Sequence, residues 1–219
     1  MKKKIINIIV LGPQGSGKGT QAKLLARRFN LAHIEVGEIL RLEAKRKTKP
    51  GRFIDRLINK EGKMVPFQTV MNLTYKKVAK VPANRGIVFD GTPRRMPEVR
   101  FWEKHLPKLK REFTHVFYLP ISKKTTLKRL GIRRNCRKCG TPFILGVDLK
   151  KNQKKCLKCG GEIYQREDDK PKAILQRLKL YYQKTKPVVS YYHNKGLLIK
   201  VNGEPAIPVV YKNILKHIR

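Results

Sequence analysis

The sequence predicts an α/β fold in which a five-stranded parallel sheet is flanked by helices. Five short apolar runs have the length of buried strands; they cover residues 5–11, 33–36, 86–90, 115–119 and 197–201. Amphipathic segments of helix length lie between them, including residues 21–30, 67–80 and 171–194. Strands that alternate with helices form parallel sheets with helices on both faces.

Two segments interrupt this alternation. Residues 37–65 are predicted to be mostly helical and are rich in Lys and Arg. Residues 132–164 carry all four cysteines with scattered Gly and Pro, which predicts a small, loop-rich insertion. A chain of 219 residues is long enough for one sizeable core that carries such insertions.

The charge of the chain is strongly positive. Lys and Arg total 52 against 15 Asp and Glu, giving a formal net charge of +37. Such a balance favours polyanionic partners, namely nucleotides, nucleic acid or an anionic membrane surface. Because the basic residues are spread over nearly the whole chain, we interpret most of them as a solvated surface. We expect no more than weak, non-specific RNA adhesion from it.

The N-terminus does not resemble a targeting segment. Three lysines precede the apolar run of residues 5–11, but this run is too short, contains Asn7 and leads directly into a Gly-rich turn. No stretch approaches the roughly 20 apolar residues of a membrane span. We therefore expect a cytoplasmic protein without a membrane partner, and in that compartment thiols stay reduced.

A Gly-rich loop follows the first predicted strand and opens a helix, which is the context that a phosphate-binding loop requires. Its glycines let backbone N–H groups surround phosphate oxygens, and the helix N-terminus adds partial positive charge. Lys18 then supplies a point charge for the terminal phosphates. The residues expected to bind a nucleoside triphosphate here are Gly12, Gly15, Ser16, Gly17, Lys18, Gly19 and Thr20.

The four cysteines have the spacing of a metal site. Cys136 and Cys139 form one C-x₂-C pair, Cys156 and Cys159 form another, and 16 residues separate the pairs. Four thiolates fill a tetrahedral shell and leave no position for water, so a structural Zn²⁺ is expected. Iron in the same cage, or a disulfide, is the alternative. A segment this small would gain much of its folding free energy from the metal.

A second segment, Asp90-Gly91-Thr92-Pro93-Arg94, stands at the end of the third predicted strand. Together with the GPQGSGKGT loop, Gly37, Arg41 and the run from Arg166 to Asp169, it resembles the adenylate kinase family of nucleoside monophosphate kinases. The resemblance extends over essentially all 219 residues in the same order.

This resemblance implies a fold like that of P-loop nucleoside triphosphate hydrolases, divided into three parts. The core would comprise residues 1–36, 66–131 and 165–219. An NMP-binding domain (37–65) would close over the acceptor, and a zinc-binding lid (132–164) over ATP. The expected reaction is ATP + AMP ⇌ 2 ADP with Mg²⁺, carried out by a monomer.

The resemblance also assigns roles to individual residues. Lys18 would hold ATP phosphates, and Asp90 would hold a hydrated Mg²⁺ through water. Arg129 would lie against the ATP adenine, near the backbone of Gly203 and Pro205. The catalytic charges would come from Lys18, Arg94, Arg133, Arg166 and Arg177. The acceptor would be bound by Val36, Arg41, Lys63, Met64, Val65, Gly91, Arg94, Glu98, Arg166 and Arg177.

Such a concentration of arginines fits phosphoryl transfer, because charge spreads over the equatorial oxygens of the transferring group. The acceptor phosphate is already largely ionised near neutral pH, so no general base is assigned. Asp168 and Asp169 are expected either to pair with the lid arginines or to serve the helix that begins near Pro171.

Three positions depart from the usual family pattern around the acceptor base: Val36 replaces a threonine, Thr92 an aromatic residue and Glu98 a glutamine. An ionised carboxylate only accepts hydrogen bonds, so Glu98 suits guanine better than adenine. AMP remains the expected acceptor, and GMP is the alternative that Glu98 motivates. Glu98 could instead pair with a nearby lysine while backbone groups read the base.

Two other classes of function remain open. A nucleic-acid-binding protein would use the cysteine segment as a zinc ribbon, and a small-molecule kinase of the shikimate type would use the same phosphate loop. The Asp90–Arg94 segment, Arg41 and the lid arginines favour the nucleoside monophosphate kinase, since they would serve a second phosphate chain.

Overall fold

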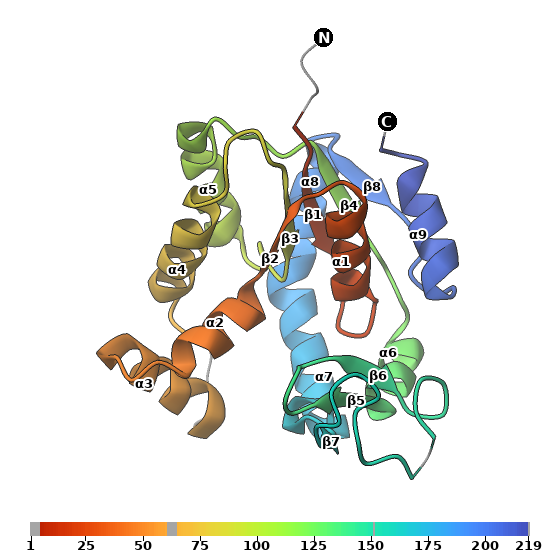
Figure 1. The fold of residues 1–219 in the computed structure, drawn as a ribbon. Helices are drawn as coiled ribbons and strands as arrows, with labels where there is room; N and C mark the ends of the chain where they lie inside the picture. The colour runs from red at the N-terminus through yellow and green to blue at the C-terminus, as the bar shows by residue number, and fades with distance from the viewer. Residues whose placement is uncertain (1–4, 61–64, 151, 219) are drawn as a thin grey trace.

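The computed structural model describes residues 5–60, 65–150 and 152–218. Its central sheet has five parallel strands, as predicted, and the structure gives their order as β2-β3-β1-β4-β8 (Figure 1). The strands are β1 (Asn7–Leu11), β2 (Ala32–Glu35), β3 (Ile87–Asp90), β4 (His115–Tyr118) and β8 (Leu198–Lys200). Each expected strand is present; β2 is shifted by one residue toward the N-terminus, and the other four are shorter by one or two residues.

Helices cover both faces of this sheet, because successive strand residues point to opposite sides. On one face, Ile8, Val10 and Phe117 pack with residues of α1 (Lys18–Arg28) and α9 (Ile207–Leu215). On the other face, Ile9 and Phe89 pack with α4 (Phe67–Ala79), α5 (Met96–His105) and α8 (Lys186–Asn194). A 3₁₀ turn, Pro107–Leu109, follows α5.

The first insertion is helical, as predicted. It consists of α2 (Val36–Ala44), α3 (Lys49–Asp55) and a π-helical turn η1 (Arg56–Lys60). Thr48 caps α3 by accepting a hydrogen bond from the N–H of Gly51, and Pro50 occupies its first turn. Val36, Ile54 and Val65 join the main core, so this arm is anchored by apolar packing.

The second insertion is a small antiparallel sheet, β6-β5-β7, that lies beyond α6 (Lys123–Gly131). Its strands are β5 (Arg133–Cys136), β6 (Pro142–Ile144) and β7 (Ile163–Tyr164). This insertion, the lid, has a small hydrophobic core whose buried residues are Cys136, Phe143, Leu149 and Cys156. Figure 1 shows α2–α3 and the lid on opposite sides of the end of the sheet where the phosphate loop lies.

The chain returns from the lid through a 3₁₀ turn, η3 (Glu167–Asp169), into a long helical segment. The sequence predicts one helix over residues 171–194, but the segment is divided into α7 (Pro171–Leu180), a π-helical turn η4 (Tyr181–Thr185) and α8. Pro187 explains the change, since it lacks the N–H that would bond four residues back and crowds that carbonyl. Within the described ranges, no helix is both long and apolar enough to cross a membrane.

Candidate active site and lid metal centre

The phosphate loop lies between β1 and α1, at the carboxyl end of the central strand. Gly15 and Gly17 have φ of 79° and 84°, a backbone region that favours glycine and turns successive N–H groups inward. The hydroxyl of Ser16 is buried in this loop without a hydrogen-bond partner among the described residues. A buried orphan donor beside a helix N-terminus fits a phosphate ligand. Gly12, Gly19 and Thr20 complete the loop and the first helical turn.

Lys18 is the focus of several charges. Its ammonium donates a hydrogen bond to the Pro13 carbonyl at 3.3 Å. Burial lowers the pKa of Lys18 to about 8, although the nearby Asp90 carboxylate opposes the shift. The positive charges of Arg94, Arg133 and Arg177 also lower this pKa. Residues from three distant parts of the chain therefore converge on Lys18.

Asp90 ends β3 directly beside the loop. A Cβ placed on Gly19 would come within 2.8 Å of a carboxylate oxygen of Asp90, so the glycine permits this approach. Burial alone would raise the pKa of Asp90, but the contact with His33 and the charges of Lys18 and Arg94 lower it below its usual value. Asp90 is thus an ionised carboxylate at the phosphate loop, suited to holding a hydrated Mg²⁺.

Arg94 is held by its own turn. Its Nε donates to the Gly91 carbonyl at 2.8 Å, and its backbone N–H donates to Glu98 Oε2 at 2.8 Å. Glu98 is buried and also accepts hydrogen bonds from the Thr92 hydroxyl and from Arg95 Nε. The alternative in which Glu98 pairs with a lysine is wrong: among the described residues its partners are an arginine, a hydroxyl and a backbone amide. Two departures from the family pattern, Thr92 and Glu98, bond to each other.

The acceptor side also contains Arg41, on α2. Its guanidinium donates to Glu35 Oε1 at 2.9 Å, and the Arg41 side chain is 51% exposed. Val36 and Val65 are buried in the same apolar cluster at the base of this arm. Lys63 and Met64, the other residues expected to line the acceptor base, lie outside the described residues.

On the lid side, Asp168 and Asp169 gather three arginines. Arg133 donates two hydrogen bonds to Asp169, at 2.8 and 2.6 Å, and Arg166 donates two to Asp168, at 2.8 and 2.7 Å. Arg177 lies 2.9 Å from an Asp168 carboxylate oxygen. Of the two roles open to the aspartates, pairing with the lid arginines is the one observed.

Burial and ion pairing act together on the pKa values of two of these residues, Arg177 and Asp168. Burial lowers the pKa of Arg177 to about 10, against the opposing charge of Asp168. Burial would raise the pKa of Asp168, but the Arg177 and Arg166 charges lower it below its usual value. The amide of Gln14 in the phosphate loop donates to the Arg177 carbonyl, which joins α7 to the loop.

Arg129 forms one wall of the site on α6. Its guanidinium donates to the carbonyls of Gly15, Gly203 and Glu204 at 3.2, 2.9 and 2.6 Å, and more weakly to that of Pro205. These bonds join the phosphate loop to the segment after β8. They fix the guanidinium plane, against which an aromatic base can stack.

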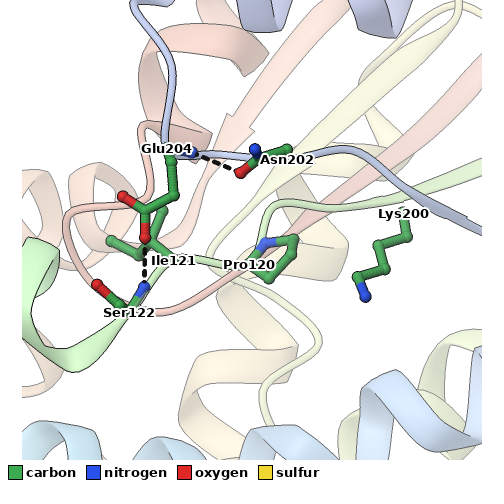
Figure 2. A pocket seen from close by; sticks show the side chains of 6 residues that line it. All are labelled: Pro120, Ile121, Ser122, Lys200, Asn202 and Glu204. Atoms are coloured by element: carbon green, nitrogen blue, oxygen red, sulfur yellow. Dashed lines mark hydrogen bonds between the residues drawn. The ribbon is translucent and has the colours of Figure 1, made fainter.

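A cavity of about 500 Å³ opens between the ends of β4 and β8 (Figure 2). It is lined by Pro120, Ile121, Ser122, Lys200, Asn202 and Glu204. Glu204 accepts a hydrogen bond from the Ser122 N–H at 2.7 Å, while its own N–H donates to Asn202 Oδ1. The cavity thus shares the Gly203–Pro205 turn with Arg129.

The four cysteines come together at the lid, from the two loops that flank β5 and β7. Cys136 Sγ lies 3.4 Å from Cys159 Sγ, and Cys139 Sγ lies 3.6 Å from Cys156 Sγ. Four thiolates about 2.3 Å from one tetrahedral Zn²⁺ are roughly 3.8 Å apart, so this arrangement is compatible with zinc. A Cβ on Gly161 would meet Cys136 Sγ at 2.9 Å. A glycine is therefore required beside the cluster.

The structure also brings together residues that the sequence analysis did not select. His33 and Glu35, on β2, lie beside Asp90, and the three side chains place possible ligand atoms within 4.8 Å of one another. The only sequence signal was their alternation, which puts both on one face of the strand.

The fold and these residues define a class: a phosphate-loop nucleotide kinase with two separate groups of arginines near the loop. Comparison with known proteins gives the family. The sequence matches the model of the family described as "Adenylate kinase" over residues 10–197, and the chain belongs to this family. It is accordingly a nucleoside monophosphate kinase, a phosphotransferase.

Similar curated proteins agree over nearly the full length. The chain is 38% identical over 211 residues to an adenylate kinase of Methanothrix thermoacetophila, covering 96% of this chain and 97% of that protein. It is 34% identical to an adenylate kinase of Archaeoglobus fulgidus, with 95% and 96% covered. A third, from Thermosipho melanesiensis, is 35% identical with 98% and 100% covered.

Proposed function

We propose that this chain catalyses ATP + AMP ⇌ 2 ADP in the presence of Mg²⁺. The observation that carries the proposal is the convergence on Lys18, where Arg94, Arg133 and Arg177 lie close enough to lower its pKa. An ammonium and three guanidiniums around one loop suit a reaction in which negative charge spreads over a transferring phosphoryl group.

The two sides of the site take different substrates in this proposal. ATP phosphates bind the loop from Gly12 to Thr20, its base lies between Arg129 and the turn at Gly203 and Pro205, and Asp90 holds Mg²⁺ through water. Mg²⁺ would offset charge on the ATP phosphates. The acceptor phosphate binds Arg41 and Arg94 and is itself the nucleophile, so no side chain needs to remove a proton.

Arg133, Arg166 and Arg177 act on the transferring group. Because Asp168 and Asp169 already hold them as bidentate or close ion pairs, their orientation costs little when substrate binds. Closure of the lid (132–164) and the acceptor arm (37–65) over a core of 1–36, 66–131 and 165–219 would then exclude water.

The contacts of Glu98 support AMP as the acceptor. One carboxylate oxygen is occupied by Thr92 and the Arg94 N–H, the other by Arg95, which leaves little capacity to accept from a guanine. In this proposal Glu98 shapes the turn that carries Arg94, and the base is read by backbone near Val65.

We also propose that the cysteine cluster holds a structural Zn²⁺. Each pair carries a glycine in the left-handed region, Gly140 or Gly160, whose N–H bonds back to the carbonyl of the first cysteine. These knuckles leave all four sulfurs available to one ion and no position for substrate.

A coupled assay of ADP formation tests the acceptor directly. With Mg²⁺ and ATP held constant, AMP, GMP, CMP and UMP are compared at equal concentrations, and AMP is expected to give the highest kcat/KM. Turnover of GMP equal to or faster than that of AMP would overturn the acceptor assignment. Salt-dependent RNA binding that nucleotides do not affect, with no ADP formed, would instead favour a zinc-ribbon protein.

A further inference from the structure

A group of three possible metal ligands lies beneath the phosphate-loop helix. His33 and Glu35 are two residues apart on β2 and therefore point to the same side of the sheet. Glu35 lies directly opposite Asp90 in the parallel pairing of β2 with β3. This face packs against α1, whose Lys23 approaches Glu35 and whose Gly19 approaches Asp90. The group is thus enclosed by a helix and two strands.

The spacing of the donor atoms fits one metal ion. Their nitrogen and oxygen atoms lie within 4.8 Å of one another. His33 Nε2 is 3.7 Å from Asp90 Oδ2, which is too long for a hydrogen bond. Two ligands each about 2.1 Å from a first-row metal ion are roughly 3 to 3.5 Å apart. His33 and Asp90 would therefore need to approach by a few tenths of an ångström, and Glu35 by no more than about 1.3 Å.

The Nε2 atom of His33 has a long contact with Asp90 but no hydrogen-bond partner among the described residues. His33 Nε2 is shielded from solvent and makes no hydrogen bond within the described part of the chain. A buried polar nitrogen without a partner is costly, and the observation calls for a ligand at that position. This nitrogen is the atom of His33 that lies 3.7 Å from Asp90 Oδ2, so a ligand bound there would also meet the carboxylate.

We propose that His33, Glu35 and Asp90 bind a divalent first-row transition-metal ion directly, next to the phosphate loop. An imidazole with two carboxylates suits ions such as Mn²⁺, Fe²⁺ or Co²⁺, whereas Mg²⁺ prefers oxygen ligands and retains much of its water. The site differs from a hydrated Mg²⁺ held by Asp90 alone, because His33 and Glu35 would enter the coordination shell.

Two cations now compensate Glu35, and both can leave it. Lys23 Nζ is 3.7 Å from Glu35 Oε2 with its side chain 52% exposed, and Arg41 is similarly exposed. Exposed ion pairs of this kind contribute little free energy, so an incoming divalent ion can displace them. A substrate phosphate that attracted Arg41 would free the same carboxylate further.

Mn²⁺ alone is the probe for this site, added to the full chain with Zn²⁺ already loaded in the lid and with no nucleotide present. The thiolate site favours softer ions, so added Mn²⁺ reports oxygen and nitrogen ligands. Electron paramagnetic resonance is expected to show one Mn²⁺ bound per chain. Pulsed measurements should show coupling to a directly bound ¹⁴N nucleus.

His33→Gln should abolish the nitrogen coupling and weaken Mn²⁺ binding at least about tenfold. Glu35→Gln should weaken binding while the coupling persists, and it provides a second test if the first variant folds poorly. His115→Gln is the matched control, since His115 lies on β4 of the same sheet and is half-buried.

The proposal is overturned if wild-type protein binds no Mn²⁺, if the bound ion shows no ¹⁴N coupling, or if the coupling survives in His33→Gln. None of these outcomes bears on phosphoryl transfer, because the Mg²⁺-dependent reaction of ATP with AMP is assayed separately on the wild-type chain. The two proposals can therefore fail independently.

Discussion

The two insertions are stabilised in opposite ways. The acceptor arm contributes Val36, Ile54 and Val65 to the main hydrophobic core, but its Arg41 is half exposed and its ion pair within the described part of the chain is with the partly exposed Glu35. The lid has a minor core around its cysteines, yet the arginines at its base are held by Asp168 and by the fully buried Asp169. The acceptor arm is therefore well anchored by apolar packing but carries an exposed arginine, whereas the lid has little apolar packing but arginines held in ion pairs with Asp168 and the buried Asp169.

This difference indicates which arginines of the proposed reaction are held in fixed positions before substrate binds. Charges that act on the transferring phosphoryl group need fixed positions, since catalysis depends on groups already oriented toward the transition state. A charge that captures an incoming acceptor can instead remain mobile. The apolar anchoring of the acceptor arm and the proposed metal of the lid are then two ways of holding a small segment in place.

The largest expected effect is the loss of a fixed charge. Lys18→Ala, Arg94→Ala and Arg133→Ala should each lower kcat by about 10³-fold, because each removes charge from the site of phosphoryl transfer. Steady-state assays with Mg²⁺, ATP and AMP provide the measurement, and circular dichroism checks the fold.

Arg134→Ala is the control for Arg133→Ala. Arg134 is the next residue on β5 and bonds to the carbonyls of Gly131 and Arg133 away from the aspartates. Its removal should change kcat less than about threefold. Equal losses of kcat in the two variants would show that the loss does not depend on where the arginine lies relative to the site.

Removal of the proposed lid metal should destabilise the lid and leave the acceptor arm unchanged. Chelation of the lid Zn²⁺, or Cys136→Ser, should release amide-exchange protection over residues 133–164, because the lid core alone buries too little apolar surface. Protection over residues 36–58 should persist. Hydrogen exchange with mass spectrometry, alongside zinc analysis, makes the measurement. Unchanged exchange in a metal-free lid would contradict the structural role of the metal.

The ion pairs should differ in their contribution to stability. Asp169→Asn leaves Arg133 without its buried partner and should lower the free energy of unfolding by about 3 kcal/mol. Glu35→Gln breaks an exposed pair with Arg41 and should cost less than about 1 kcal/mol in metal-free buffer. Urea unfolding compares them. A larger loss for Glu35→Gln would reverse the comparison.

A smaller effect is expected from the titration of Lys18. Since its pKa is lowered to about 8, the free protein begins to lose this charge as pH rises through that value. ATP phosphates favour the charged form, so ATP binding at about pH 9 should take up a proton and weaken as pH rises further. The stability of the free protein should change in the opposite direction. Burying the charged Lys18 destabilises the folded state, and this destabilisation is lost as pH rises from about 8 to the unfolded value of 10.5.

Calorimetry in two buffers of different ionisation enthalpy measures this proton uptake. Lys18→Met, which cannot titrate, should show much less uptake at about pH 9. Equal uptake by both proteins would assign the proton to another group.

The sheet and the phosphate loop could be predicted because local signals agree with the global fold. Each strand is a short apolar run, and the loop has glycines where the chain needs left-handed backbone, as at Gly15 and Gly17. The cysteine spacing similarly predicted a cluster, since two knuckles determine which sulfurs can meet. The roles of individual arginines remain predictions.

The features that were not predicted depend on contacts between distant segments. The partners of Glu98 follow from how the turn after β3 folds onto α5, which no spacing in the sequence reveals. The meeting of His33 with Asp90 depends on the register of β2 against β3. Likewise, a proline within a helical segment can either end the helix or widen one turn of it, and the structure shows the widened turn before Pro187.

The most direct test of the central proposal is the reverse reaction, started from ADP alone. With Mg²⁺ and no other substrate, the protein should convert two ADP into ATP and AMP in equal amounts. One ADP binds as the phosphoryl donor and becomes AMP, and the other binds as the acceptor and becomes ATP. Chromatography of the nucleotides resolves the products. Failure to form ATP and AMP, in protein that is folded and carries its lid metal, would contradict the account.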